Sequence, residues 1–155
     1  MDSHAEVRRA GAADTASVGR LLDAFNREFD EPTPGAERLA ARIGELLEQG
    51  DTAVLLAGAG PDGLAVLRFR PAIWSQALEC YLAELYVAPL LRRRGLGRGL
   101  MNAAIELARS RGADHIELGT GEQDVAARAL YESLGFSNRE GKADGQLNYC
   151  YELEL

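Results

Sequence analysis

Apolar residues spaced three and four positions apart predict four amphipathic helices along the chain. The expected helices cover residues 15–29, 34–49, 96–111 and 124–134. Asp14 precedes the first helix as its expected N-cap, and Thr33 takes the same place before the second, with Pro34 at the first helical position. Gly50 and Gly112 then mark the ends of the second and third helices.

Segments rich in β-branched, aliphatic and aromatic residues lie between these helices and predict strands. They cover residues 6–10, 52–57, 64–70, 80–87, 115–118 and 147–155. The segment CYLAELYV, residues 80–87, is apolar almost throughout, which is typical of a central strand buried on both faces. The tail LNYCYELEL alternates apolar and polar residues and is expected to form the last strand. This order of strands and helices predicts one mixed α/β domain over residues 1–155.

The composition is that of a globular domain without targeting signals. The chain has 155 residues, of which 46% are hydrophobic and 26% are charged. We see no long uncharged apolar run and no signal-peptide pattern, so we expect a cytoplasmic protein without a membrane partner. Cys80 and Cys150 form no CxxC motif, and His4 and His115 lack neighbouring ligands, so no metal is expected. The formal net charge of -7 argues against a general nucleic-acid binder.

The segment RRRGLGRG, residues 92–99, concentrates four arginines and three glycines after the expected central strand. A strand, a glycine-bearing loop and a helix N-terminus make an anion site, because unpaired N–H groups and the helix dipole point at one spot. The segment is no P-loop, because no Gly-Lys-Ser/Thr follows, and Leu100 replaces the third glycine of a dinucleotide fingerprint. What remains is Arg-x-x-Gly-x-Gly at Arg92, Gly95 and Gly97, and an ordinary turn with a solvated arginine rim is the alternative.

Two segments resemble the signatures of the GCN5-related N-acetyltransferase (GNAT) superfamily. LYVAPLLRRRGLGRGLM looks like that family's acetyl-coenzyme A motif, and AARALYESLGF, residues 126–136, resembles its second signature, in the expected order and separation. The resemblance implies a GNAT fold, a mixed and mostly antiparallel sheet with about four helices, in which acetyl-CoA binds where the fourth and fifth strands splay apart. It also implies that the following residues hold acetyl-CoA: Leu85, Tyr86, Val87, Arg92, Arg93, Arg94, Gly95, Leu96, Gly97, Arg98 and Ala127.

Acetyl transfer needs a neutral amine, whereas an alkylamine has a pKa of about 10.4, so a base is required. Glu84 is the only charged residue within CYLAELYV, and an ionised carboxylate in an apolar strand is costly. In the family, an acidic residue near this place often acts as general base, directly or through water, which implies that role for Glu84. The alternative is a salt bridge to Arg68 or Arg70 on the preceding strand.

Tyr131 and Asp124 lie in and at the start of the last expected helix. Tyr131 matches the tyrosine that in many family members gives a proton to the departing sulfur of coenzyme A, and a phenol offers such a proton. Its alternative role is apolar packing with Ala127 and Leu134 at helical spacing. Asp124 stands where many members carry Asn, seven residues before the tyrosine, and it is expected either to cap the helix or to face the substrate amine.

Carboxylates in the expected variable regions favour a cationic acceptor, because an acidic surface attracts cations. The candidate substrate-binding residues are Asp30, Glu31, Glu122 and Asp124, and ordinary solvated charges are the alternative for each. The overall pattern also resembles the small aminoglycoside 3-N-acetyltransferases, which implies an aminoglycoside antibiotic, and hence resistance, or a polyamine. A peptide or protein amine is a second interpretation, and a non-catalytic coenzyme A-binding module is a third. The tail LNYCYELEL could pair across a two-fold axis in a homodimer.

Overall fold

The computed structural model describes residues 6–155, so His4, which was weighed as a metal ligand, lies outside the described residues. Contacts divide the chain into two compact units, the residues up to Leu118 and the residues Gly119–Leu155. The first unit contains the sheet and three α-helices, and the second contains the last helix and the C-terminal tail. The expectation of a single domain over residues 1–155 stays a prediction.

The first unit is built on a five-stranded sheet with the strand order β1-β2-β3-β4-β5. The strands are β1 (Val7–Arg9), β2 (Thr52–Ala57), β3 (Gly63–Pro71), β4 (Leu78–Val87) and β5 (Ala113–Glu117). Neighbouring strands are antiparallel except β4 and β5, which are parallel because the helix α3 (Leu96–Ser110) crosses over between them. The mixed, mostly antiparallel sheet expected from the sequence is thereby confirmed.

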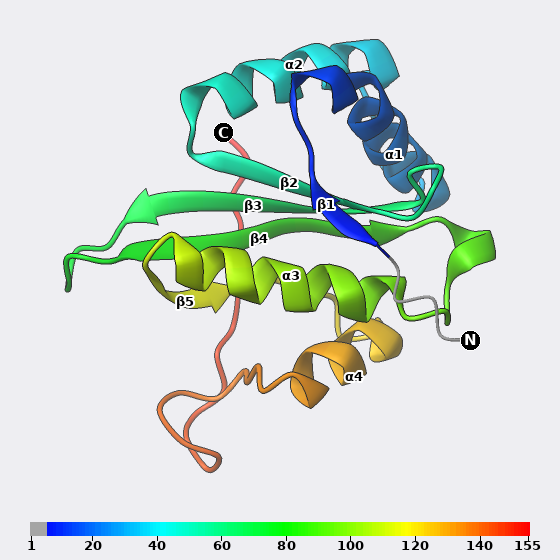
Figure 1. Ribbon diagram of the computed structural model, residues 1–155. Coiled ribbons are helices and arrows are strands. Elements are labelled where there is room, and N and C mark those ends of the chain that lie inside the picture. Colours follow the sequence, from blue (N-terminus) through cyan, green and yellow to red (C-terminus); the bar gives the residue numbers. More distant parts are fainter. Residues whose placement is uncertain (1–5) are drawn as a thin grey trace. The chain divides into compact units, whose positions relative to one another are not determined.

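Helices cover both faces of this sheet (Figure 1). The helices α1 (Thr15–Glu28) and α2 (Ala36–Gln49) lie on one face, and α3 lies on the other. Gly19 allows α1 and α2 to approach closely, because a Cβ atom at this position would lie 2.4 Å from the carbonyl oxygen of Ala36. The core beneath α1 and α2 combines residues from the helices and the sheet: Ala10, Val18, Leu21, Ile43, Val54, Leu56, Leu64, Val66 and Tyr86.

Two predicted helix starts differ in detail from the structure. The helix α2 begins at Ala36 rather than at Pro34. The reason is that the Thr33 hydroxyl donates to Asp23 Oδ1 at 2.8 Å and accepts from the Gly35 N–H at 3.2 Å, so Thr33 belongs to the loop. Asp14 does lie at the N-cap of α1, but its carboxylate accepts from the Gly11 N–H at 2.8 Å and from Arg8 instead of from the helix.

The second unit holds α4 (Val125–Ser133) and a tail without a strand. The prediction of a final strand over residues 147–155 is wrong for the described chain. A strand needs a partner for its backbone groups, and in this unit the pairing is limited to an isolated bridge between Arg139 and Leu147. Residues 148–155 are exposed, including the apolar side chains whose alternation suggested a strand.

Candidate functional site

The strands β4 and β5 part in the middle of β4. Their pairing begins at Leu78 with Ala113 and ends at Tyr81 with Glu117. Beyond this point the residues from Leu82 to Val87 pair only with β3, so the other edge of this half of β4 is open within the first unit. An open edge offers unpaired N–H and C=O groups to a ligand that lies along the strand.

Leu85 and Val87 direct their backbone groups toward this open edge. Successive residues of an antiparallel strand point their N–H and C=O groups alternately toward the partner and away from it. The Ala88 N–H donates to the Asp62 carbonyl at 2.8 Å, on the side of β3, so Val87 and Leu85 face the opposite way in the same register. The Val87 carbonyl indeed accepts a hydrogen bond of 2.9 Å from Nε of Arg92, which lies outside the sheet.

Glu84 sits beside an irregularity that bends β4. The register passes from Val66 opposite Glu84 to Leu67 opposite Leu82, so Ala83 is an extra residue in β4, as in a β-bulge. The Glu84 side chain is accessible to solvent, yet the surrounding protein removes part of its hydration and raises the pKa of the carboxyl above its ordinary value. A carboxylate of this kind is a stronger base than a fully hydrated one.

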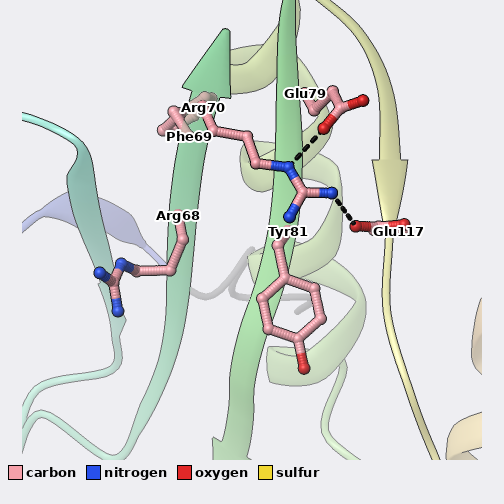
Figure 2. A pocket seen from close by; sticks show the side chains of 6 residues that line it. All are labelled: Arg68, Phe69, Arg70, Glu79, Tyr81 and Glu117. Atoms are coloured by element: carbon pink, nitrogen blue, oxygen red, sulfur yellow. Dashed lines mark hydrogen bonds and ion pairs between the residues drawn. The ribbon is translucent and has the colours of Figure 1, made fainter. Parts of the chain in front are cut away.

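The alternative prediction, that Glu84 forms a salt bridge with Arg68 or Arg70, is wrong. Arg70 pairs instead with Glu79 on β4 and with Glu117 on β5, the latter at 3.1 Å (Figure 2). Arg68 lies opposite Tyr81 in the register and forms no ion pair with any described residue. Glu84 therefore has no cationic partner in the described part of the chain, which leaves its carboxylate available for a substrate proton.

The hollow in Figure 2 lies where β4 and β5 part, and no motif in the sequence predicted it. It encloses about 260 Å³ and is lined by side chains of three adjacent strands: Arg68, Phe69, Arg70, Glu79, Tyr81 and Glu117. Both carboxylates in the hollow bind Arg70, and Arg68 supplies a second positive charge to the lining. The two arginines balance the two glutamates, so the hollow offers no net negative charge to a cationic amine.

The loop between β4 and α3 has the backbone of an anion cradle. After a short 3₁₀ turn (Pro89–Leu91), Arg93 has φ = 64° and Gly95 has φ = 83°, both in the left-handed region. No described residue accepts a hydrogen bond from the backbone N–H groups of residues 93–97, and no side chain caps α3. These N–H groups and the positive end of the helix dipole thus lie at the start of α3 without an acceptor among the described residues, and the anion site expected there stays a prediction.

The arginines of this loop differ in their surroundings. Arg93 and Arg94 are exposed and form no ion pair with any described residue, and Arg98 is exposed as well. Arg92 instead pairs with Glu28 at 2.8 Å. Glu28 was missed by the sequence reasoning, although an acidic residue in the last turn of a helix, where the helix dipole disfavours negative charge, was a usable signal.

In the second unit, Asp124 and Tyr131 have distinct environments. Asp124 is the N-cap of α4, and its carboxylate accepts from the Ala127 N–H at 3.3 Å, which confirms the predicted capping role. Tyr131 is buried, with its ring 6.0 Å from that of Phe136 in an edge-on arrangement. Burial, and secondarily the charge of Asp124, raise the pKa of the Tyr131 phenol, so it keeps its proton at neutral pH.

The remaining candidate substrate residues are exposed carboxylates. Asp30 and Glu31 lie in the connection between α1 and α2, in the first unit. Asp30 has φ = 54°, and the Glu31 N–H donates to the Asn26 carbonyl at 2.8 Å, so the backbone of this connection is ordered. Glu122 precedes α4 in the second unit, and its carbonyl accepts from Arg128. None of these three carboxylates forms an ion pair with a described residue.

No helix in residues 6–155 is long and apolar enough to cross a membrane. No group of three or more His, Cys, Asp or Glu side chains in the same range is arranged to hold a metal ion.

Known proteins share both the sequence pattern and this fold. The model of the Acetyltransferase (GNAT) family matches residues 19–136. A protein from Arthrobacter sp. FB24, provisionally named an acetyltransferase, is 46% identical in sequence, with 96% of each chain covered and a TM-score of 0.84. The uncharacterized N-acetyltransferase YhfO of Bacillus subtilis (strain 168) is 27% identical over 149 residues, which are 95% of this chain and 97% of that protein.

A more distant structural neighbour is an aminoglycoside acetyltransferase from an uncultured soil metagenomic sample, solved in complex with sisomicin. It superposes with a TM-score of 0.76 over 99% of each chain, but only 19% of the residues are identical. At this identity, the likeness establishes a common fold.

Proposed function

The chain belongs to the acetyltransferase (GNAT) family and is an N-acetyltransferase, and we propose that it acetylates a primary amine of a small polycationic molecule. Members of the family use acetyl-CoA, whose thioester supplies the acetyl group. One observation supports the binding of acetyl-CoA by this chain. The open edge of β4 leads directly into a loop whose N–H groups, from Arg93 to Gly97, have no acceptor among the described residues.

The residues present fit acetyl-CoA. The backbone groups of Leu85 and the N–H of Val87 on the open edge would bind the amide-bearing arm of the cofactor as an added strand binds a sheet edge. The N–H groups of residues 93–97 would bind the pyrophosphate, and the exposed side chains of Arg93 and Arg94 would add charge-assisted contacts to phosphate oxygens. The backbone of Tyr86 faces β3 in this register, so its contribution is its buried side chain.

The chemistry divides among three groups of the chain. Glu84 would accept a proton from the ammonium form of the substrate, directly or through water, so that the nitrogen lone pair can attack the acetyl carbonyl carbon. An N–H group of the β4 edge would donate to the carbonyl oxygen as negative charge develops there. As the carbon–sulfur bond breaks, Tyr131 would donate its proton to the departing sulfur.

The acceptor class is argued from charge. The chain carries a formal net charge of -7, and Asp30, Glu31 and Glu122 are exposed without cationic partners among the described residues. Adjacent carboxylates such as Asp30 and Glu31 favour a molecule with several ammonium groups over a neutral or acidic one. An aminoglycoside or a polyamine has this chemistry, and we propose an aminoglycoside as the first candidate.

A panel of amines tests the proposal. The protein is incubated with acetyl-CoA and with aminoglycosides, linear polyamines, monoamines and amine-bearing peptides, and release of the thiol is followed over time. We expect turnover with the polycationic amines, confirmed by mass spectrometry of the acetylated product. Turnover confined to the peptides would favour the alternative of a peptide or protein acetyltransferase. Hydrolysis of acetyl-CoA without any acetylated product would overturn the proposal.

A homodimer and a cytoplasmic location stay predictions. The structure contains a single chain, and the tail that was expected to pair across a two-fold axis forms no strand in it. Light scattering of the purified protein measures the mass in solution directly.

A further inference from the structure

Glu28 places a carboxylate at the C-terminal end of the helix α1, where a negative charge is unfavourable. It is the last residue of α1, where the negative end of the helix dipole disfavours a carboxylate. Its Oε1 atom accepts a hydrogen bond of 2.9 Å from the Tyr86 phenol and another of 2.9 Å from Nη2 of Arg92, and Oε2 lies 2.8 Å from the same nitrogen. The carboxylate is thus compensated by groups of β4 and of the loop that follows it.

Two of the three guanidinium nitrogens of Arg92 bind other groups of the protein. Its Nε donates to the Val87 carbonyl at 2.9 Å, its Nη2 binds Glu28, and its guanidinium carbon lies 5.6 Å from the centre of the Tyr86 ring. Tyr86 in turn stacks on Phe25 of α1, with ring centres 4.8 Å apart. Nε and Nη2 of Arg92 are thus bound within the protein, whereas the side chains of Arg93 and Arg94 form no ion pair with any described residue.

The anchored residue immediately precedes the anion cradle. Arg92 has an extended backbone, and Arg93 and Gly95 with their positive φ values follow it. The bond from Arg92 to Val87 closes the segment Val87–Arg92 into a ring, and the pair with Glu28 fixes that ring to α1. The orientation of the N–H groups of residues 93–97 therefore depends on where Arg92 is held.

We propose that Glu28 and Arg92 form a positioning pair for the cofactor loop, in which Arg92 binds Glu28 and Val87 instead of phosphate. The inference rests on the proposed function, because it concerns the binding of acetyl-CoA. It assigns Arg92 a different task from the phosphate contact that the sequence resemblance implied. It also predicts that loss of Glu28 weakens the cofactor site indirectly, because Glu28 lies on α1 and acts on the loop through Arg92.

The experiment measures the dissociation constant of acetyl-CoA by calorimetry for the wild-type chain, Glu28→Gln, Arg92→Gln and the double variant. We expect each single variant to bind about three- to tenfold more weakly, and the double variant to bind no more weakly than the worse single one, because both changes break the same link. The KM for acetyl-CoA rises correspondingly, while kcat and the KM for the amine change little. Arg27→Gln, which alters the neighbouring exposed arginine paired with Asp23, is the matched control and keeps the wild-type affinity.

The direction in which Glu28→Gln changes the affinity for acetyl-CoA separates this proposal from the alternative that Arg92 binds phosphate directly. If Arg92 were a phosphate ligand restrained by Glu28, its release would tighten acetyl-CoA binding. The salt dependence gives a second readout, because each lost phosphate contact reduces the slope of log affinity against log salt. Arg92→Gln should leave this slope unchanged, whereas Arg94→Gln should reduce it.

Tighter binding by Glu28→Gln, a reduced salt slope for Arg92→Gln, or additive losses in the double variant would each overturn the proposal. The circular dichroism and thermal midpoint of each variant show whether it is folded, and if Glu28→Gln is unstable, Arg92→Gln with its salt slope carries the test. If the wild-type chain itself binds no acetyl-CoA, the proposed function fails. Wild-type binding with unaffected variants would refute only the positioning pair.

Discussion

Glu84 combines two properties that a general base at neutral pH requires. Its carboxyl has a raised pKa because the surrounding protein removes part of its hydration, and it has no ion-pair partner among the described residues. Glu79, on the same strand, is the opposite case, because Arg70 binds it. Two carboxylates five residues apart are thus suited to different tasks by their neighbours alone.

Replacing Glu84 with Gln should reduce kcat by about 10²-fold, because the variant loses the proton acceptor. The wild-type rate should fall at low pH as Glu84 becomes protonated, with a midpoint above the ordinary pKa of a glutamate. In the variant this limb should disappear, and the residual rate should rise with pH as more substrate amine loses its proton. The pH dependence of kcat at saturating acetyl-CoA measures both effects.

Glu79→Gln is the control for this prediction, because it removes a carboxylate and an ion pair from β4 but should leave the acidic limb in place. The affinity for acetyl-CoA should stay at the wild-type value in Glu84→Gln. Equal turnover of Glu84→Gln and wild type across neutral pH would refute the assignment of Glu84 as the base.

Glu84→Gln should lower activity but should not lower the free energy of unfolding near neutral pH. Because the folded pKa is raised, the stabilisation linked to Glu84 is full below the pKa of the unfolded chain and is lost as the pH rises through the folded pKa. The variant has no such loss. Urea unfolding should therefore show the variant to be at least as stable as wild type near neutral pH, and no more stable below about pH 4.

Replacing Tyr131 with Phe should reduce kcat by about tenfold to 10²-fold, because only the proton donor is lost. The ring stays buried against Phe136 in the variant, so the thermal midpoint should change little. Phe136→Leu is the converse control, with lower stability and nearly unchanged chemistry in the folded protein. A Tyr131→Phe variant with wild-type kcat would show that the leaving sulfur takes its proton from elsewhere.

At the scale of the elements, the junction between β4 and α3 supplies the open strand edge and the helix start that the proposed cofactor site requires. The strand loses its β5 partner after Tyr81, which frees one edge, and α3 begins with N–H groups that no described residue caps. The loop between them depends on left-handed backbone at Gly95. A glycine is favoured there because a side chain in this conformation costs about 1–2 kcal/mol.

Gly95→Ala should lower the free energy of unfolding by about 1 kcal/mol and weaken acetyl-CoA binding. Nothing lies within 4 Å of the added Cβ atom, so the cost is backbone strain and not a clash. Gly50→Ala is a matched control, because Gly50 has φ = 88° at the end of α2 and is equally open. The control should lose similar stability in urea unfolding but keep the wild-type affinity for acetyl-CoA, and equal affinities in both variants would contradict this account of the loop.

The junction between β1 and α1 predicts a loss of stability in acid. Hydrogen bonds from Arg8 and from the Gly11 N–H lower the pKa of Asp14 to about 2. A lowered folded pKa means that the stabilisation is present above the pKa of the unfolded chain and is lost as the pH falls through the folded pKa. Asp14→Asn should thus be less stable than wild type near neutral pH, and the difference should shrink between about pH 4 and pH 2. Urea midpoints measured across this range, with Asp51→Asn as an exposed control, test the expectation.

At the scale of the whole molecule, the net charge of -7 coexists with a cationic cofactor loop. The two charges suit two different ligands, because the loop would bind the anionic cofactor and the remaining surface would attract the proposed cationic amine. With saturating acetyl-CoA, the KM for a polyamine should rise several-fold as salt is raised from about 0.05 M to 0.5 M, since screening shortens the reach of the carboxylates. The KM for a monoamine should rise much less, and equal salt dependence for both amines would refute electrostatic selection of the acceptor.

The order of most elements, and the place of the loop between β4 and α3, were determined by the sequence itself. Helical periodicity, turn residues and the spacing of Arg92, Gly95 and Gly97 are local signals, and local backbone preference is enough to produce the structures they predict. The same locality explains the errors. Thr33 was expected to cap a helix but binds Asp23 across the turn, and the alternating tail found no strand partner in its unit.

The tertiary structure alone decided where β4 and β5 part, that Arg70 is taken by Glu79 and Glu117, and that Arg92 binds Glu28, a residue 64 positions earlier. Each of these depends on which side chains the assembled sheet brings together, and no pattern within a short window contains that information. The loop sequence thus indicates an anion site, while the fold determines which of its arginines is bound to another part of the protein.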